Sequence, residues 1–137
     1  MSWDEQVKTM GSYTGDKMFY GAINGLDGNK WASKGAMEVS QEEVLFAIKV
    51  CSHNGSELGK AQGSGIYLAG KKFKFLRSDS EEKSVTFTRS ENEKLHNGFA
   101  ILTKQTILIC VCEEEGKGSA ASTGACKMAD YLQSVDY

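Results

Sequence analysis

The chain has 137 residues, a formal net charge of −2 and an apolar fraction of 40%. This length suits one domain with its own core, and the composition excludes collagen-like, low-complexity and disordered proteins. The near-neutral charge argues against a dedicated nucleic-acid-binding protein, which would be strongly basic. The longest apolar run, Ile107–Cys112, is far shorter than the ~20 residues of a membrane helix. The polar first residues do not resemble a signal peptide, so we expect one soluble, cytoplasmic domain over residues 1–137.

Two segments carry a helix-capping pattern. In Ser2–Glu5 and in Ser40–Glu43, a serine precedes a glutamate by three positions, so each side chain can bond a backbone N–H at the helix start. Apolar residues follow both segments at helical spacing. Gly11 marks a plausible end for the first helix. The predicted helices cover residues 3–10 and 41–51.

Alternating apolar and polar residues predict short strands in the rest of the chain. Asp27 and Gly28 form a hairpin-turn signal, because this pair tolerates the positive φ of tight turns. Another turn is predicted at Ala69 and Gly70. The strand-like ranges are 17–24, 30–33, 66–68, 72–75, 85–88, 99–102 and 106–112.

The remaining segments are predicted to be two loops and a final helix. Residues 53–65 are rich in glycine and polar residues, which favours a loop, and residues 113–118 are predicted to form a charged loop. Helical spacing returns over residues 120–135. The order of helix, strand pair, helix, meander and helix predicts an α+β fold, with helices packed on an antiparallel sheet.

The four cysteines give little support for a metal or redox site. Cys110 and Cys112 lie two apart in an apolar run, so both point to one sheet face, where thiols pack as small hydrophobic groups. A metal site is the alternative. However, the chain has no CxxC pair, and neither His53 nor His96 has ligand-like spacing to a cysteine. We expect free structural thiols in a reducing compartment, with no metal and no cofactor. The other two cysteines are Cys51 and Cys126.

Catalytic motifs are missing from the sequence. It contains no GxSxG, Walker, HExxH or GxGxxG pattern. The glutamates at 113–115 fit a solvated turn, and two histidines without a fixed partner are a poor basis for acid–base catalysis. We therefore expect a protein that is not an enzyme.

Aromatic residues stand near both ends of the chain, with Trp3 at the first helix and Tyr131 and Tyr137 at the last. This placement suggests that the terminal helices pack side by side with rings along their seam. Such rings, together with Trp31, suit a stiff proline-rich ligand. The alternative is that the rings only fasten the helices to the sheet, and the spacing alone slightly favours that alternative.

Basic residues are concentrated on the predicted meander. They could bind an acidic protein or a phosphoinositide. They could equally form a solvated strand face whose lysines block edge pairing. These residues are Lys71, Lys72, Lys74, Arg77 and Arg89.

Six segments match, in order, the sequence pattern of one known family. They are Ser2-Trp3, Gly25–Ala32, Ser40–Glu43, Gly65–Phe73, Thr103–Ile109, and Met128–Leu132 with the final Tyr137. On these residues the chain resembles the profilins, which are small actin-monomer-binding proteins. The resemblance implies a central antiparallel sheet of about six strands. It places the N- and C-terminal helices on one face and smaller helices on the other.

The resemblance also implies partners. A profilin would bind monomeric actin and promote exchange of its nucleotide, bind proline-rich proteins such as formins, and bind phosphoinositide head groups in competition with both. It would be a monomeric protein that acts on the cytoskeleton, and it would not bind nucleic acid. Carried over by position, the polyproline-binding residues are Trp3, Trp31, Tyr131, Leu132 and Tyr137. The actin-binding residues are Lys72, Lys74, Arg77, Arg89, Asn97, Lys117, Thr123 and Lys127.

Two departures from the family pattern bear on these partners. Gln6 stands where profilins usually have tyrosine, and Lys127 stands where an acidic residue is common. One alternative is therefore a divergent adaptor for polyproline or lipid with weak actin affinity. Another is a small-ligand sensor, which needs a cavity with convergent polar groups, and the sequence reveals no such set.

Overall fold

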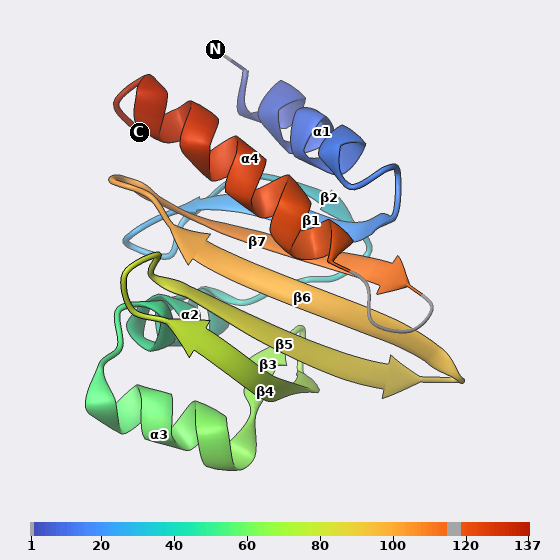
Figure 1. Ribbon diagram of the computed structural model, residues 1–137, viewed down its shortest axis with the longest axis vertical. Coiled ribbons are helices and arrows are strands. Elements are labelled where there is room, and N and C mark those ends of the chain that lie inside the picture. Colours follow the sequence, from blue (N-terminus) through green and yellow to red (C-terminus); the bar gives the residue numbers. More distant parts are fainter. Residues whose placement is uncertain (1, 115–118) are drawn as a thin grey trace.

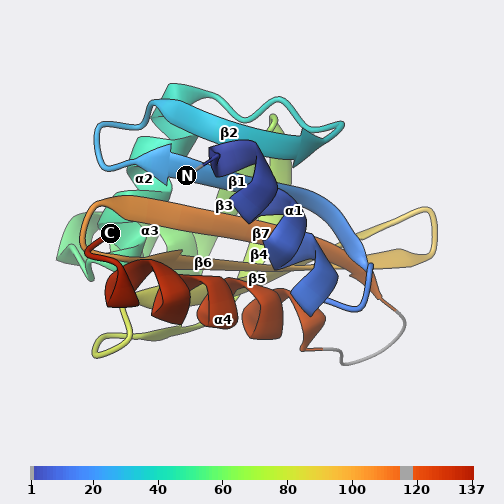
Figure 2. The same cartoon turned by 90° about the horizontal axis from the view of Figure 1, so that it is seen from above.

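The computed structural model describes residues 2–114 and 119–137. One seven-stranded antiparallel sheet, ordered β2-β1-β7-β6-β5-β4-β3, lies between two pairs of helices (Figures 1 and 2). The strands are β1 (Met18–Gly25), β2 (Lys30–Gly35), β3 (Ile66–Leu68), β4 (Lys71–Asp79), β5 (Ser84–Glu91), β6 (Lys94–Leu102) and β7 (Thr106–Glu114). The helices are α1 (Trp3–Tyr13), α2 (Gln41–Cys51), α3 (Gly55–Ser64) and α4 (Ala120–Ser134).

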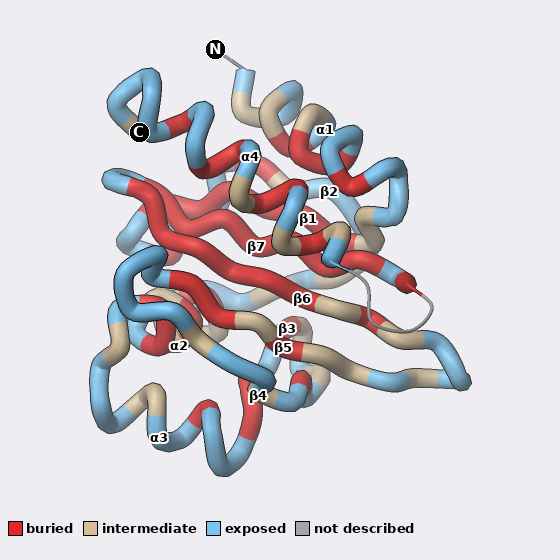
Figure 3. The backbone as a smooth tube through the Cα atoms, viewed as in Figure 1, coloured by how far each residue is buried: buried red, intermediate tan, exposed pale blue. Residues whose placement is uncertain are grey.

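The sheet has an apolar core on each face, because alternate residues of its central strands point in opposite directions. In β7, Ile107, Ile109 and Val111 belong to the core under α2 and α3, whereas Leu108 and Cys110 belong to the core under α1 and α4. Both sets are fully buried, so β7 forms the centre of the molecule (Figure 3). The α+β fold predicted from the sequence is confirmed, with seven strands instead of about six.

The terminal helices pack against each other and against the sheet. Met10 of α1 and Met128 of α4 are completely buried in their shared core. The helices approach closely at Gly124, where an added Cβ would lie 2.6 Å from Thr14 Cγ2 and 3.0 Å from the Met10 carbonyl oxygen. This approach is possible because glycine lacks a Cβ. The predicted side-by-side packing of the terminal helices is confirmed.

Gly11 does not end α1, which continues to Tyr13. Gly11 is buried, and a Cβ there would come within 3.0 Å of the Met18 side chain. The glycine therefore permits close packing of α1 on β1. Thr14 ends the helix: its hydroxyl donates to the Gly11 carbonyl and accepts from the backbone N–H of Met18.

The predicted loop over residues 53–65 is wrong, because this segment contains α3. Leu58 and Ala61 of α3 pack on the core below α2, and Gly65 ends the helix with a φ of 84°. Tertiary contacts outweigh the low helix propensity of its glycines. The predicted charged loop over residues 113–118 also begins too early, because Glu113 and Glu114 belong to β7; residues 115–118 lie outside the described part of the chain.

The four cysteines are free thiols, as predicted. The Sγ atoms of Cys110 and Cys112 lie 3.9 Å apart on one buried face of β7, and Cys51 is also buried. Within the described residues, no three His, Cys, Asp or Glu side chains gather as a metal site would require. The helices of the same residues are too short or too polar to cross a bilayer.

Candidate ligand-binding surfaces

Three aromatic rings from distant parts of the chain meet where α1 begins and α4 ends. The ring centroid of Trp3 lies 4.8 Å from that of Trp31 and 5.0 Å from that of Tyr137. The Trp31 and Tyr137 centroids are 6.4 Å apart. The two pairs that involve Tyr137 are edge-on, which suits the quadrupoles of the rings.

Local backbone contacts hold each ring in place. The Tyr137 carbonyl oxygen accepts from the Gln105 backbone N–H and the Thr103 hydroxyl, each at 2.7 Å. This fixes the segment after α4 against the turn between β6 and β7. Trp31 lies directly over Gly25, where an added Cβ would come within 3.0 Å of the indole Nε1. The missing Cβ of Gly25 therefore allows the indole to approach β1 this closely.

The rings leave polar and apolar surface open to a ligand. Trp31 is 37% exposed and Tyr131, on the last turns of α4, is 41% exposed. Their N–H and O–H groups, like those of Trp3 and Tyr137, make no hydrogen bond to another residue within 2–114 or 119–137. We refer to Trp3, Trp31, Tyr131 and Tyr137 as the aromatic patch.

Leu132 does not belong to this patch, contrary to the sequence-based prediction. Its side chain is completely buried in the core between α4 and the sheet. Leu132 still supports the patch, since its carbonyl oxygen accepts from the Tyr137 backbone N–H at 2.7 Å. Helical spacing places Leu132 with the buried Met128 and Ala129, whereas the resemblance to profilins placed it among the polyproline-binding residues.

The predicted actin-binding residues lie on more than one surface. Lys72 and Lys74 of β4 are exposed and point away from Phe73, toward the sheet face that α1 and α4 cover in part. Asn97 of β6 lies on this face too, opposite Thr88. Arg77 borders a cleft of about 290 Å³ beside α4, together with Ser122 and Cys126. The structure therefore brings Lys72, Lys74, Arg77 and Asn97 to one sheet face, which we call the basic face.

Arg89 lies apart from the basic face. It shares the opposite sheet face with Phe87, because the register of β5 with β6 is regular there. Its Nη1 donates to the Lys72 carbonyl oxygen at 3.1 Å, and its Nε lies 3.6 Å from Glu91 Oε2. Lys71 Nζ donates to the same oxygen at 3.1 Å, and this bond is the main reason that the pKa of Glu91 is lowered.

The predicted residues of α4 are less compact. Thr123 is exposed near the start of the helix. Lys127 Nζ lies 5.6 Å from the ring centroid of Tyr13, so the lysine faces α1 rather than the cleft.

Two other predicted actin-binding residues lie outside α4. Asn97 Nδ2 of β6 donates to Glu114 Oε2 at 2.9 Å and is engaged within the protein. Lys117 lies outside the described residues.

One structural contact of Glu43 could not be predicted from the sequence. Glu43 closes the predicted capping box of α2, and its carboxylate also accepts from the backbone N–H groups of Ala69 and Gly70, at 2.8 and 2.9 Å. Both turn residues have positive φ, of 55° and 73°. A single carboxylate thus joins α2 to the β3–β4 turn. No local sequence pattern indicates this contact, because Glu43 and Ala69 lie 26 residues apart.

Comparisons with known proteins by sequence agree on one family. A family model described as Profilin matches residues 1–137. The chain is similar to Profilin-3 of Caenorhabditis elegans, with 29% identity over 140 residues and all of both chains covered. Among solved structures, it is similar to Acanthamoeba castellanii profilin II, with a TM-score of 0.80, 26% identity and coverage of 99% of this chain and 100% of the other.

The fold is also similar to that of mouse profilin IIa, solved in complex with a double repeat from the FH1 domain of mDia1. This comparison has a TM-score of 0.79 and 18% identity, and it covers 100% of both chains.

Proposed function

The chain belongs to the profilin family of non-enzymatic actin-binding proteins, and we propose that it controls actin polymerisation in the cytoplasm by binding monomeric actin and proline-rich protein segments. The aromatic patch would bind the proline-rich segment. The basic face would contact actin. The two surfaces lie on different parts of the molecule, so one protein could deliver an actin monomer to a proline-rich partner.

The observation that carries this proposal is the geometry of the aromatic patch. A proline-rich segment forms a stiff helix without internal hydrogen bonds, so its carbonyl groups need outside donors. The patch offers flat rings for the proline side chains and indole N–H and phenol O–H groups for the carbonyls. The mouse profilin IIa complex with an FH1 repeat supports the same type of partner.

Calorimetric titration with a proline decamer tests this part of the proposal. Trp31→Ala should weaken binding by roughly 30-fold or more, because central aromatic residues commonly contribute at least ~2 kcal/mol. Gln6→Tyr should strengthen it several-fold by adding a ring one helical turn after Trp3. Tyr13→Ser is the matched control, because it removes an exposed ring from the far end of the same helix. Equal affinities of wild type and Trp31→Ala would exclude the aromatic patch as the binding site.

Monomeric actin is assigned to the basic face because its exposed lysines are free of ion pairs with other residues in the described ranges. Lys74→Glu should weaken actin binding by about tenfold or more in an assay of pyrene-actin assembly. Arg89→Glu should have a smaller effect, since Arg89 reaches this face only through its bond to the Lys72 carbonyl. If wild type does not slow spontaneous nucleation at any concentration, the weak-actin adaptor replaces this proposal.

Phosphoinositide binding is the third proposed activity. Lys72, Lys74 and Arg77 supply exposed positive charge that could contact an anionic head group. Because the same residues would contact actin, lipid and actin should compete. Sedimentation with vesicles containing phosphatidylinositol bisphosphate tests this. Binding that actin monomers do not reduce would contradict a shared surface.

A further inference from the structure

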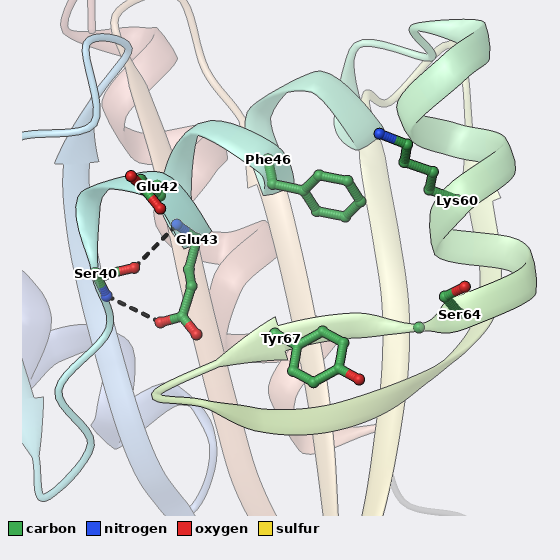
Figure 4. Close-up of a pocket in the computed structure, with 8 residues that line it drawn as sticks. Ser40, Glu42, Glu43, Phe46, Lys60, Ser64 and Tyr67 are labelled. Carbon is green, nitrogen blue, oxygen red and sulfur yellow. Dashed lines mark hydrogen bonds between the residues drawn. The ribbon is translucent and has the colours of Figure 1, made fainter.

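A cavity of about 590 Å³ lies at the β3 edge of the sheet, whereas Trp31 of the aromatic patch lies on β2 at the other edge. It opens between α2, α3 and the edge strand β3 (Figure 4). This volume is within the range of ~300–1,000 Å³ for small-molecule sites. The residues lining it are Ser40, Glu42, Glu43, Phe46, Lys60, Ser64, Gly65 and Tyr67.

Two aromatic rings give the cavity its apolar surface. Phe46 extends from α2 and packs in part on the core, while Tyr67 extends from β3 and is 46% exposed. Figure 4 shows both rings on the cavity side of their elements. An exposed tyrosine ring facing a second aromatic side chain across a cavity is suited to a flat apolar ligand.

The polar groups of the cavity are divided between its two sides. Lys60 and Ser64 extend from α3, with the Lys60 amine directed toward the Phe46 ring, and the Tyr67 hydroxyl points to the side on which α3 lies (Figure 4). None of these three groups forms a hydrogen bond or ion pair with another side chain or backbone group in the described ranges. The α3 side therefore presents three free donors, one of which carries a positive charge.

The α2 side carries the two acidic residues of the cavity lining, Glu42 and Glu43. The Glu43 carboxylate accepts three backbone N–H groups, from Ser40, Ala69 and Gly70, which fix its position at the β3–β4 turn. Glu42 is exposed, and Figure 4 shows it on the far side from Lys60. An anionic ligand group would thus be attracted to the α3 side, with its apolar body between the rings.

We propose that this cavity is a binding site for a small aromatic anion. The ring of the ligand lies between Phe46 and Tyr67, and its carboxylate, sulfonate or phosphate group accepts hydrogen bonds from Lys60, Ser64 and the Tyr67 hydroxyl. The protein then carries a small-ligand site at the sheet edge opposite the one that carries Trp31, in addition to its family's protein partners.

The wall formed by α3 is suited to adapting to such a ligand. Gly55, Gly59 and Gly63 recur every four residues, and a Cβ added to any of them would meet no atom within 4 Å. No steric requirement explains these glycines, and Gly59, in the middle of α3, lowers the intrinsic stability of the helix relative to alanine. A helix of low intrinsic stability can shift to close on a bound ring at small cost.

Two fluorescent probes test the proposal on the full chain. The anionic probe is 8-anilinonaphthalene-1-sulfonate, and N-phenyl-1-naphthylamine has the same rings without the sulfonate. Lys60→Glu should weaken binding of the anionic probe by about tenfold or more, as expected for loss of a charge-assisted bond, and leave the neutral probe unchanged. Tyr67→Ala should weaken both probes. Lys49→Glu is the matched control, because it makes the same charge change at an exposed position of α2 outside the cavity.

Saturating proline decamer should not displace either probe, since Trp31 on β2 and Tyr67 on β3 lie at opposite edges of the sheet. The proposal is overturned if wild type does not bind the anionic probe, if Lys60→Glu and Lys49→Glu weaken it equally, or if the decamer displaces it. Circular dichroism and thermal unfolding of each variant establish that the fold is intact, because this probe also binds partly unfolded chains.

Discussion

The two helix layers that cover the sheet are built in different ways. The layer of α1 and α4 is held by completely buried side chains such as Met10, Met128 and Leu132, and by backbone approach at Gly124. The layer of α2 and α3 has a well-packed α2, but α3 contributes Ala61 as its only fully buried residue within the described core. One carboxylate, that of Glu43, joins this layer to the β3–β4 turn. The aromatic patch is therefore held by two tightly packed helices, whereas the open cavity borders a helix with few buried side chains.

Removing the Glu43 carboxylate, which joins the α2–α3 layer to the sheet, should cause the largest loss of stability. Glu43→Ala leaves three backbone N–H groups without their acceptor and should lower the free energy of unfolding by about 2–3 kcal/mol. Urea denaturation measures the loss. Glu42→Ala is the control and should change stability by less than about 0.5 kcal/mol, because its exposed side chain makes no specific contact. Equal losses in the two variants would show that the bonds to the turn contribute nothing.

A methyl group between α1 and α4 should have the next largest effect. Gly124→Ala places a Cβ against Thr14 and the Met10 carbonyl, and we expect a net loss of about 1–2 kcal/mol despite the better helix propensity of alanine. Because α1 must move, affinity for the proline decamer should also fall. Unfolding and calorimetry on the same variant measure both effects. Unchanged stability would mean that the terminal helices are not packed closely at this point.

High pH should destabilise the core under α2. Burial raises the pKa of Cys51 from 9.0 to about 12, so the folded state holds the proton more tightly than the unfolded state. Stability is fully present below pH 9 and declines as the pH rises toward 12, with roughly 1 kcal/mol lost by pH 10. Burial, and secondarily Glu43, raises the pKa of Tyr20 to about 12, which adds to the loss above pH 10. Urea titrations from pH 8 to 11 measure the slope, and Cys51→Ala should reduce it; an identical slope in that variant would assign the loss to other groups.

The smallest predicted effect is a gain in stability. Gly59 occupies the fifth position of α3, as Gly124 does in α4, but its missing Cβ faces open space. Gly59→Ala should therefore raise the free energy of unfolding by about 0.5–1 kcal/mol. Amide hydrogen exchange should slow in α3 and remain unchanged in α1. A loss of stability would contradict the difference between the two layers.

Local signals predicted some elements well. The bounds of α2 were predicted correctly because its capping box and apolar stripe agree, and the structure contains both halves of that box. By contrast, α3 was missed because only Leu58 and Ala61 mark its inward side. Gly11 was misread as a helix end, since a glycine that permits close packing has the same local pattern as one that ends a helix.

The candidate sites were predictable only where family motifs exist. The ring positions of Trp3, Trp31 and Tyr137 followed from the resemblance to profilins, and the structure brings these rings together. The position of Arg77 on the basic face depends on the β-bulge between Phe75 and Arg77, which the sequence did not reveal. The cavity could not be predicted, because its lining comes from three separate segments, on α2, α3 and β3.

The aromatic patch as the site for proline-rich ligands is the central claim, and nuclear magnetic resonance tests it most directly. In a ¹⁵N-labelled sample titrated with proline decamer, the indole N–H signals of Trp3 and Trp31 should shift most, followed by backbone signals at the start of α1 and the end of α4. Backbone signals from α3, including that of Lys60, should not shift. The claim is contradicted if the indole signals do not move, or if the largest shifts lie around Phe46 and Tyr67.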